Sequence, residues 1–148
     1  MKRPAPTAVL FVCSMNAVRS PMAEGLFRRR FGSRHYVESC GVRAGGEVDG
    51  LAVQVLDELG VDISRHRPRP IGDIEVGEFE LVVTLAPEAH HRALEYTRTL
   101  PIEVEYWPCA DPTVMEGARE QRLWEYRSVR DALDARIANR FAPPLKPQ

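Results

Sequence analysis

Short apolar runs alternate along this chain with segments whose apolar residues recur at helical spacing. Continuous apolar runs at 8–12 and 81–85 predict two buried strands. The segment 36–40 predicts a further strand, and 102–106, where apolar and charged residues alternate, predicts a strand at a sheet edge. The spacing between these runs is long enough for a helix after each of the first three strands.

Helix signals fill those intervals. The first helix is expected to begin with Ser20 as its N-cap and Pro21 at its first position. The second is expected to be capped by Asp49 and to end at Gly60, and a loop with one short turn follows it. A third helix begins at Pro87. The final helix carries apolar residues at four-residue intervals: Val129, Leu133, Ile137 and Phe141.

This alternation predicts an α/β fold. Strands that alternate with helices pair in parallel through right-handed crossovers. We therefore expect a three-layer α/β/α domain with a four-stranded, doubly wound parallel sheet and a phosphate-binding loop after the first strand. One domain is expected to span 1–148, with the proline-rich 143–148 as a flexible tail. Ligands of such sheets bind at the carboxyl ends of the strands.

The loop after the first strand carries the most informative chemistry. Cys13 ends the apolar run, and Arg19 stands six residues later, at the start of the first helix. Backbone N–H groups and a helix N-terminus meet around this loop and favour an oxyanion. Positive potential favours the ionised form of a thiol, and the planar guanidinium can hold two oxygens at once. A nucleophile attacking a phosphorus atom is predicted; the alternative is an inert cysteine beside a solvated arginine.

A second candidate lies in the loop after the fourth strand, in the run Trp107–Thr113. If all strands are parallel, this loop also begins at the carboxyl end of its strand and can reach the loop after the first strand. Asp111 could then protonate a departing oxygen and later serve as the base for water. An isolated Asp-Pro pair is otherwise a common turn.

Composition excludes several other classes. Of 148 residues, 20 are Lys or Arg and 21 are Asp or Glu, so the formal net charge is −1 and no overall field favours nucleic acid or an acidic membrane. Three cysteines without close spacing fit a reducing compartment. No segment resembles a signal peptide or a membrane span. We expect a cytoplasmic protein, monomeric or weakly dimeric, without nucleic-acid or membrane partners.

The chain resembles the low-molecular-weight protein tyrosine phosphatases, which overlap in fold with the thioredoxin-coupled arsenate reductases. The resemblance rests on the C-x5-R-S-P run after the first strand and on segments throughout the chain. These are 39–42, 60–66, 81–84 and Asp111-Pro112.

The resemblance implies a cysteinyl-phosphate mechanism that needs no metal and no cofactor. Cys13 would attack, Arg19 and the loop amides would hold the oxygens, and Asp111 would shuttle the proton. The expected substrate is a phosphotyrosine-containing protein or a small aryl phosphate. The phosphate-binding loop would comprise Ser14, Met15, Asn16, Ala17, Val18, Arg19 and Ser20.

Three further roles come from the resemblance. Asn16 matches an asparagine that braces the loop, where an amide side chain tolerates a left-handed backbone. Ser20 matches a hydroxyl that donates to the nucleophilic sulfur. His66 matches a histidine that supports the asparagine from behind; otherwise it is a solvated loop residue.

Several positions depart from the family pattern. Met15 replaces a glycine and could reshape the loop, and Val18 replaces a second cysteine, so that redox protection is expected to be absent. Thr113 replaces a tyrosine, and the loop after the second strand lacks the usual aromatic wall. Apolar surface could come instead from Met15, Trp107 or Tyr106. Preference for an aromatic phosphoester is therefore left open.

Two alternative functions remain. An arsenate reductase of the same fold would use the same cradle, because arsenate mimics phosphate. The thioredoxin-coupled enzymes need two further cysteines, and the segment 84–90 has none, while Cys40 and Cys109 are expected to be bystanders. A non-catalytic module that binds phosphoproteins or senses thiols would need neither nucleophile nor acid. The sequence alone therefore favours a phosphatase.

Overall fold

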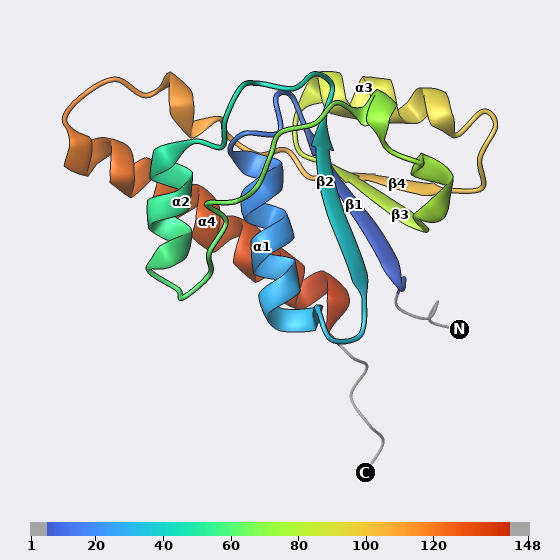
Figure 1. The fold of residues 1–148 in the computed structure, drawn as a ribbon, viewed down its shortest axis with the longest axis horizontal. Coiled ribbons are helices and arrows are strands. Elements are labelled where there is room, and N and C mark those ends of the chain that lie inside the picture. Colours follow the sequence, from blue (N-terminus) through green and yellow to red (C-terminus); the bar gives the residue numbers. More distant parts are fainter. Residues whose placement is uncertain (1–5, 143–148) are drawn as a thin grey trace, which may run out of the picture.

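A parallel four-stranded sheet organises residues 6–142, the part of the chain that the computed structural model describes (Figure 1). Its strands are β1 (Ala8–Cys13), β2 (Tyr36–Gly41), β3 (Leu81–Thr84) and β4 (Glu103–Tyr106), in the order β2-β1-β3-β4. The expected doubly wound α/β fold is confirmed, with β4 at an edge. The tail expected at 143–148 lies outside the described residues.

Three helices cover one face of the sheet, as Figure 1 shows: α1 (Arg19–Phe31), α2 (Gly50–Asp57) and α4 (Arg119–Phe141). Val9 and Phe11 of β1 point toward this side and join one apolar cluster with residues of all three helices. Phe11 is fully buried. Full burial of such a side chain contributes about 1.5–3 kcal/mol.

The opposite face is covered by α3 (Pro87–Tyr96) and by two 3-10 turns, Ile71–Asp73 and Val76–Glu78. Leu10 and Val12, the alternate residues of β1, pack into this second apolar cluster. The sequence predicted only one short turn in the preceding loop. The second turn brings Val76 and Phe79 into the cluster, which the local proline and glycine content did not indicate. Within the described residues, no helix combines the length and apolar character needed to cross a membrane.

The strand order places the loop after β1 at a topological switch point. The chain leaves β1 toward α1 on one face and leaves the neighbouring β3 toward α3 on the other. A crevice therefore opens at the carboxyl ends of these two strands, which is where open α/β sheets bind ligands. Cys13 is the last residue of β1.

The start of α1 differs from the sequence prediction. The helix begins at Arg19, and Val18 occupies the N-cap position without a side-chain hydrogen bond. Ser20 is not the N-cap, because it lies within the first turn with its buried hydroxyl 2.8 Å from Cys13 Sγ. The N–H groups at this helix end are thus left uncapped by any side chain and face the loop.

The predicted cap of α2 is confirmed. Asp49 Oδ1 accepts hydrogen bonds from the N–H groups of Leu51 (2.8 Å) and Ala52 (3.2 Å). The helix ends at Asp57, and the turn that follows closes at Gly60, whose φ of 75° lies in the left-handed region. Asp49 therefore marks the start of this helix, and Gly60 marks the turn that follows its end.

An ion-pair network fixes α2 against α4. Glu58 accepts hydrogen bonds from Arg127 and, at 2.7 Å, from Arg130, which also donates to the carbonyl of Val55 at 2.8 Å. The hydrogen bonds from Arg127, with a smaller contribution from Arg130, lower the pKa of Glu58 to about 2. The carboxylate is partly exposed, so solvent screens the network.

This network predicts a pH-dependent stability. Because the pKa of Glu58 is lower in the folded chain, its contribution is complete above its ordinary pKa of 4.5 and is lost as pH falls toward about 2. Glu58→Gln should lower the free energy of unfolding at neutral pH by about 1 kcal/mol in urea titrations. Glu116→Gln, at an exposed acid, is the control. If Glu58→Gln lowered the free energy of unfolding by the same amount at neutral pH and near pH 2, the stabilising role of the Glu58 carboxylate would be contradicted.

Candidate active site

The loop between β1 and α1 is held in place through its backbone carbonyl groups. Four of its carbonyl oxygens accept hydrogen bonds from the segment after β2. Within the described residues, the N–H groups of 14–18 donate to no other group, so they are available to an anion held in the loop. The four bonds join Cys13 O to Val42 N (3.0 Å), Ser14 O to Arg43 N (3.1 Å), Met15 O to Gly45 N (3.0 Å) and Ala17 O to Asp49 N (2.9 Å).

Asn16 braces this loop from its buried side. Its backbone is left-handed, with φ of 56°, and its side chain is fully buried. The amide nitrogen donates to Ser20 Oγ (2.8 Å) and Ser39 Oγ (3.1 Å). The amide oxygen accepts from His66 Nε2 (2.9 Å) and from the Arg69 N–H (3.0 Å). All four hydrogen-bonding positions of the amide are therefore used.

Ser20 links this brace to the sulfur of Cys13. Its hydroxyl oxygen accepts from Asn16, which leaves the hydroxyl hydrogen free to donate. The nearest acceptor is Cys13 Sγ at 2.8 Å, and the Cys40 carbonyl is farther away at 3.3 Å. A hydrogen bond donated to sulfur favours the thiolate form of a cysteine.

Gly41, the last residue of β2, allows the loop to approach the sheet closely. A Cβ at this position would lie 2.8 Å from the Asn16 nitrogen and 2.9 Å from the Met15 carbonyl carbon. Both atoms belong to the backbone and cannot move without displacing the loop. This contact explains physically why a glycine follows Ser39-Cys40 in this chain.

His66 supports Asn16 from the segment that follows α2. Both atoms that face His66 Nε2 are acceptors, the backbone and side-chain oxygens of Asn16, so Nε2 carries the hydrogen. Burial lowers the pKa of His66, and the carboxylate of Glu24, 3.9 Å from Nδ1, acts in the opposite direction. The hydrogen on Nε2 keeps the amide of Asn16 in one orientation, because it can be donated only to an oxygen.

Arg19 and Asp111 come together above the loop. Arg19 donates to the Cys109 carbonyl at 2.9 Å, and its guanidinium lies 3.9 Å from the Asp111 carboxylate. Asp111 Oδ1 also accepts from the N–H (3.0 Å) and hydroxyl (2.6 Å) of Thr113. Its other oxygen faces Arg19. The loop after β4 therefore holds a carboxylate beside the guanidinium, as the sequence had suggested for parallel strands.

These residues surround a hollow of about 290 Å³, which we call the Cys13 hollow. Met15 is 39% exposed and lies against Gly45, where a Cβ would be 2.9 Å from the Met15 side chain. The methionine is accommodated without loss of the left-handed turn at Asn16. Trp107 is buried against Phe11 and does not line the hollow. The lining residues are Cys13, Ser14, Met15, Ala17, Val18, Arg19, Gly45, Glu47, Asp49, Asp111 and Thr113.

Tyr106 does not line the hollow either, since it stacks on His90 with ring centroids 4.7 Å apart. Of the three residues suggested as apolar surface, only Met15 lines the hollow.

The sequence did not indicate the roles of two further residues. Asp49, expected only as a helix cap, lines the hollow and accepts from the Tyr126 hydroxyl at 3.2 Å. Ser39 contacts Asn16, and no local pattern indicated that long-range contact.

The two other cysteines are poor candidates for an ionised thiol. Cys40 is fully buried on the α3 face of the sheet, and burial raises its pKa to about 12. Cys109 lies in the loop after β4, where burial raises its pKa to about 11 against an opposing effect of Arg19. Both thiols are therefore protonated at neutral pH. Among the described residues, no group of three or more His, Cys, Asp or Glu side chains could hold a metal ion.

Comparison with known proteins gives two kinds of relative. The chain is 33% identical to an arsenate reductase from Bacillus licheniformis over 135 residues, which cover 90% of this chain and 94% of the relative. Three more bacterial relatives at 32–34% identity carry the same name. A solved arsenate reductase in a phosphate-binding state is 29% identical with a TM-score of 0.73, covering 92% of this chain and 97% of that one.

The other kind of relative is a phosphatase. The low molecular weight protein tyrosine phosphatase from T. tengcongensis is 27% identical with a TM-score of 0.75, covering 88% of this chain and 95% of that one. A family model described as low molecular weight phosphotyrosine protein phosphatase matches residues 8–145. This match includes the loop, the Asp111 segment and every strand of the sheet. The chain therefore belongs to the low molecular weight phosphotyrosine protein phosphatase family, whose solved structural relatives include arsenate reductases.

Proposed function

We propose that Cys13 attacks the central atom of a tetrahedral oxyanion bound in the loop. The observation that carries this proposal is the 2.8 Å contact between Cys13 Sγ and Ser20 Oγ, beside a loop whose backbone N–H groups donate to no described residue. Fixed donors of this kind stabilise charge that develops on oxygen during the reaction. A buried inert cysteine would need neither the donors nor the guanidinium of Arg19.

The remaining residues divide into two groups. Arg19 contacts the oxyanion, and Asp111 supplies a proton to the departing oxygen. Asn16, Ser20 and His66 act through other groups as positioning residues: they fix the loop and keep a hydrogen bond aimed at the sulfur.

We propose arsenate reduction as the first candidate reaction. The sequence alone ranked phosphotyrosine hydrolysis higher, but the names of the curated relatives support the opposite order. Arsenate has the charge and tetrahedral shape of phosphate, so the same N–H groups and guanidinium suit it. The Cys13 hollow, with a volume of about 290 Å³, has room for a free oxyanion.

The electrons for this reaction would come from an external thiol. The thiolate of Cys13 bonds to arsenic while one oxygen leaves as water with the proton from Asp111. An external thiolate then attacks Cys13 Sγ, the sulfur–arsenic bond breaks, and its electron pair stays on arsenic, which leaves as arsenite. A second external thiol frees Cys13 from the mixed disulfide. The balance is two thiols oxidised to one disulfide. An external donor is proposed because 84–90 contains no cysteine, Cys40 is buried on the opposite face of the sheet, and burial raises the pKa of Cys109.

Hydrolysis of a phosphate monoester is the second candidate, and it is supported by the solved phosphatase relative. It needs no second thiol, since water would attack the cysteinyl phosphate with Asp111 as base. Met15 is the apolar side chain most exposed at the rim, and none of the described residues that line the hollow is aromatic. An aromatic leaving group would therefore be held by little more than the methionine.

The two candidates are separated by assaying both reactions on one preparation. With glutathione and glutaredoxin, or with thioredoxin and its reductase, we expect arsenite to form and to require Cys13, so that Cys13→Ser abolishes it. Cys109→Ser is the matched control and should retain full activity. If p-nitrophenyl phosphate is hydrolysed while arsenate is not reduced by either donor system, the second candidate replaces the first. If neither substrate turns over, the enzymatic proposal is wrong.

Asp111→Asn tests the proton donor. Loss of general acid catalysis should lower turnover about 100-fold or more. With aryl phosphates, the loss should be larger for esters with poor leaving groups than for activated ones, because only the former need the proton. Glu47→Gln, another carboxylate at the hollow, serves as the control and should change turnover little. Equal losses for all leaving groups would remove Asp111 from this role.

A further inference from the structure

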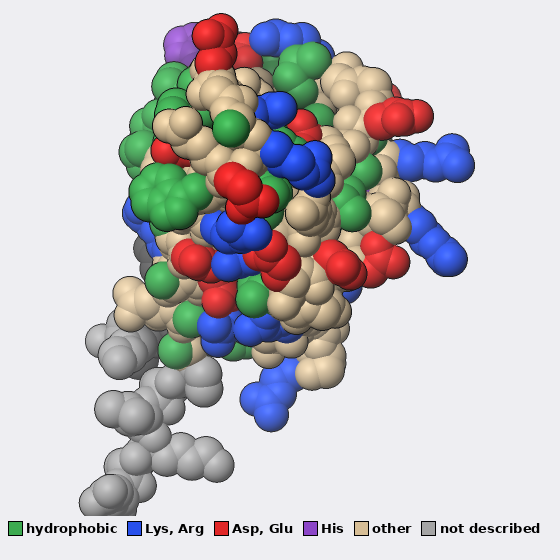
Figure 2. All heavy atoms as spheres, turned by 90° about the vertical axis from the view of Figure 1, so that its left-hand side faces the viewer, with side chains coloured by type: hydrophobic (Ala, Val, Ile, Leu, Met, Phe, Trp, Pro, Cys, Tyr) green, Lys and Arg blue, Asp and Glu red, His purple; other side chains and the backbone are tan. Residues whose placement is uncertain are grey.

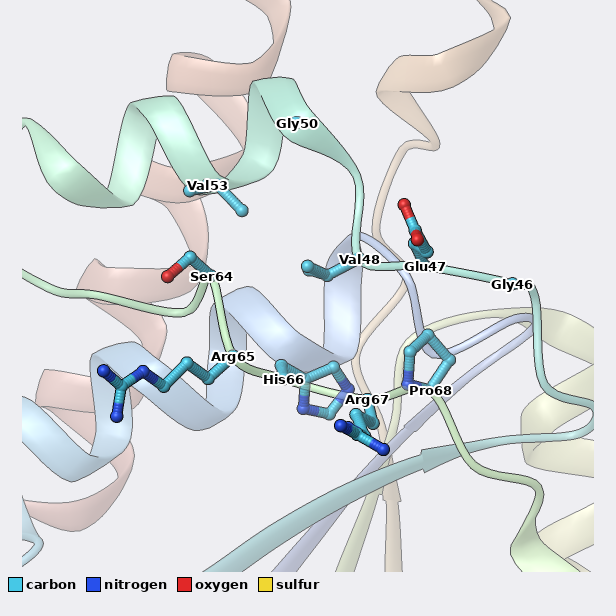
Figure 3. Close-up of a pocket in the computed structure, with 10 residues that line it drawn as sticks. All are labelled: Gly46, Glu47, Val48, Gly50, Val53, Ser64, Arg65, His66, Arg67 and Pro68. Atoms are coloured by element: carbon cyan, nitrogen blue, oxygen red, sulfur yellow. The ribbon is translucent and has the colours of Figure 1, made fainter.

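A second and larger hollow lies beside the Cys13 hollow. It is a groove of about 990 Å³ between the segment that leads into α2 and the segment 64–68 (Figure 3). We call it the arginine groove. In Figure 3, Val48 and Val53 stand above it, and Arg65, His66 and Arg67 extend from the segment below. The groove is distinct from the Cys13 hollow, and Glu47 lines both.

Two cations on this groove make no hydrogen bond and no ion pair with the described residues. They are Arg65 and Arg67, and the charge of Arg65 helps to lower the pKa of the exposed Asp62. The neighbouring arginines are neutralised, since Arg28 pairs with Glu24 and Arg69 pairs with Glu38. Positive charge is therefore concentrated on the segment 65–67, at the edge of a cavity.

The surface nearby does not share this charge. On the face that carries α2 and the beginning of α4, acidic and basic side chains are interspersed (Figure 2). The formal net charge of the chain is −1. The two free guanidinium groups are therefore a local feature of the arginine groove, and they do not belong to a generally basic surface.

The size of the groove suits a stretch of polypeptide better than a free ion. Cavities of about 300–1,000 Å³ hold organic ligands of drug size, and this one is at the upper end of that range. Its wall is partly bare backbone: a Cβ at Gly46 or at Gly50 would meet nothing within 4 Å. Such a wall offers room for a chain, and Val48 and Val53 offer apolar contact.

The groove is also coupled to the catalytic loop. His66 stands between the two free arginines and contacts both oxygens of Asn16, and Glu47 connects the groove to the Cys13 hollow. A chain lying in the groove would pass directly beside the loop. Charge complementarity then indicates which chain it accepts.

We propose that the arginine groove binds an acidic stretch of a polypeptide partner and so presents that partner to the Cys13 hollow. Carboxylates of the partner pair with Arg65 and Arg67, whose planar guanidinium groups suit two-point contact with carboxylate. This role goes beyond the oxyanion chemistry proposed above and does not depend on whether arsenate or a phosphate ester is the substrate.

The probe is a fluorescently labelled hexaglutamate peptide, with a labelled Gly-Ser hexapeptide as the uncharged reference. Fluorescence anisotropy should show binding of hexaglutamate only, with an affinity that falls as salt is added. The double variant Arg65→Gln/Arg67→Gln should weaken binding about fivefold or more. Arg34→Gln, at an exposed arginine whose side chain also makes no hydrogen bond or salt bridge with the described residues, should leave it unchanged.

A pair of substitutions at Gly50 tests the location without removing any existing side chain. Gly50→Glu adds a carboxylate to the groove wall where a Cβ meets no neighbour, and it suits the first position of α2 because acids stabilise helix N-termini. It should weaken hexaglutamate binding about threefold or more, whereas the neutral Gly50→Gln should have little effect. The melting temperature of each variant checks that the fold is intact.

Three outcomes would overturn the proposal. The first is that hexaglutamate does not bind. The second is that the arginine variant and Gly50→Glu bind hexaglutamate as tightly as the wild type does. The third is that inorganic phosphate, at equal charge concentration, displaces the peptide completely, which would indicate a simple anion site. Each readout is binding in the absence of turnover. Failure here is therefore distinguishable from failure of the proposed reaction, which is measured by arsenite or phosphate release.

Discussion

The left-handed, fully bonded Asn16 is the constraint on which the rest of the site depends. A loop that turns several N–H groups toward one point leaves its carbonyl groups pointing outward, and both sets need partners or a ligand. The segment after β2 satisfies the carbonyl groups, and the Asn16 amide ties the turn to Ser20, Ser39, His66 and Arg69. Because that amide has no unused position, removing the side-chain partner at Ser20, Ser39 or His66 leaves a buried polar group unsatisfied, which costs about 1–3 kcal/mol.

The second constraint is the parallel sheet itself. Because β1 and β4 run in the same direction, the loops that follow them leave the same edge, and residues about ninety positions apart in the chain meet there. The carbonyl of Cys109 fixes Arg19 while Asp111 stands beside its guanidinium. The proposed nucleophile and cation lie at the end of β1 and the start of α1, and the proposed acid lies on the loop after β4, so the parallel strand order brings the three together.

Much of this arrangement could be predicted from the sequence because the relevant signals are local. Apolar runs and their spacing located the strands, and Asp49 and Gly60 marked the ends of the second helix region. Local reasoning failed at Ser20, since its hydroxyl is used by a long-range network around Cys13 and Asn16 in place of a cap. It failed at Trp107 and Tyr106 because packing on α4 and α3 sets their directions. The contacts of Ser39 and the groove beside Arg65 depend on three-dimensional neighbours that no spacing rule records.

The central proposal is that the loop holds an oxyanion directly over the sulfur of Cys13, the proposed nucleophile. The most direct measurement is the rate of alkylation of each cysteine by iodoacetate, followed by mass spectrometry, with and without arsenate or phosphate. The account predicts that Cys13 reacts fastest near neutral pH, that Cys40 and Cys109 react slowly, and that either oxyanion protects Cys13 alone. A Cys13 that reacts no faster than the other two, or that either oxyanion fails to protect, would contradict it.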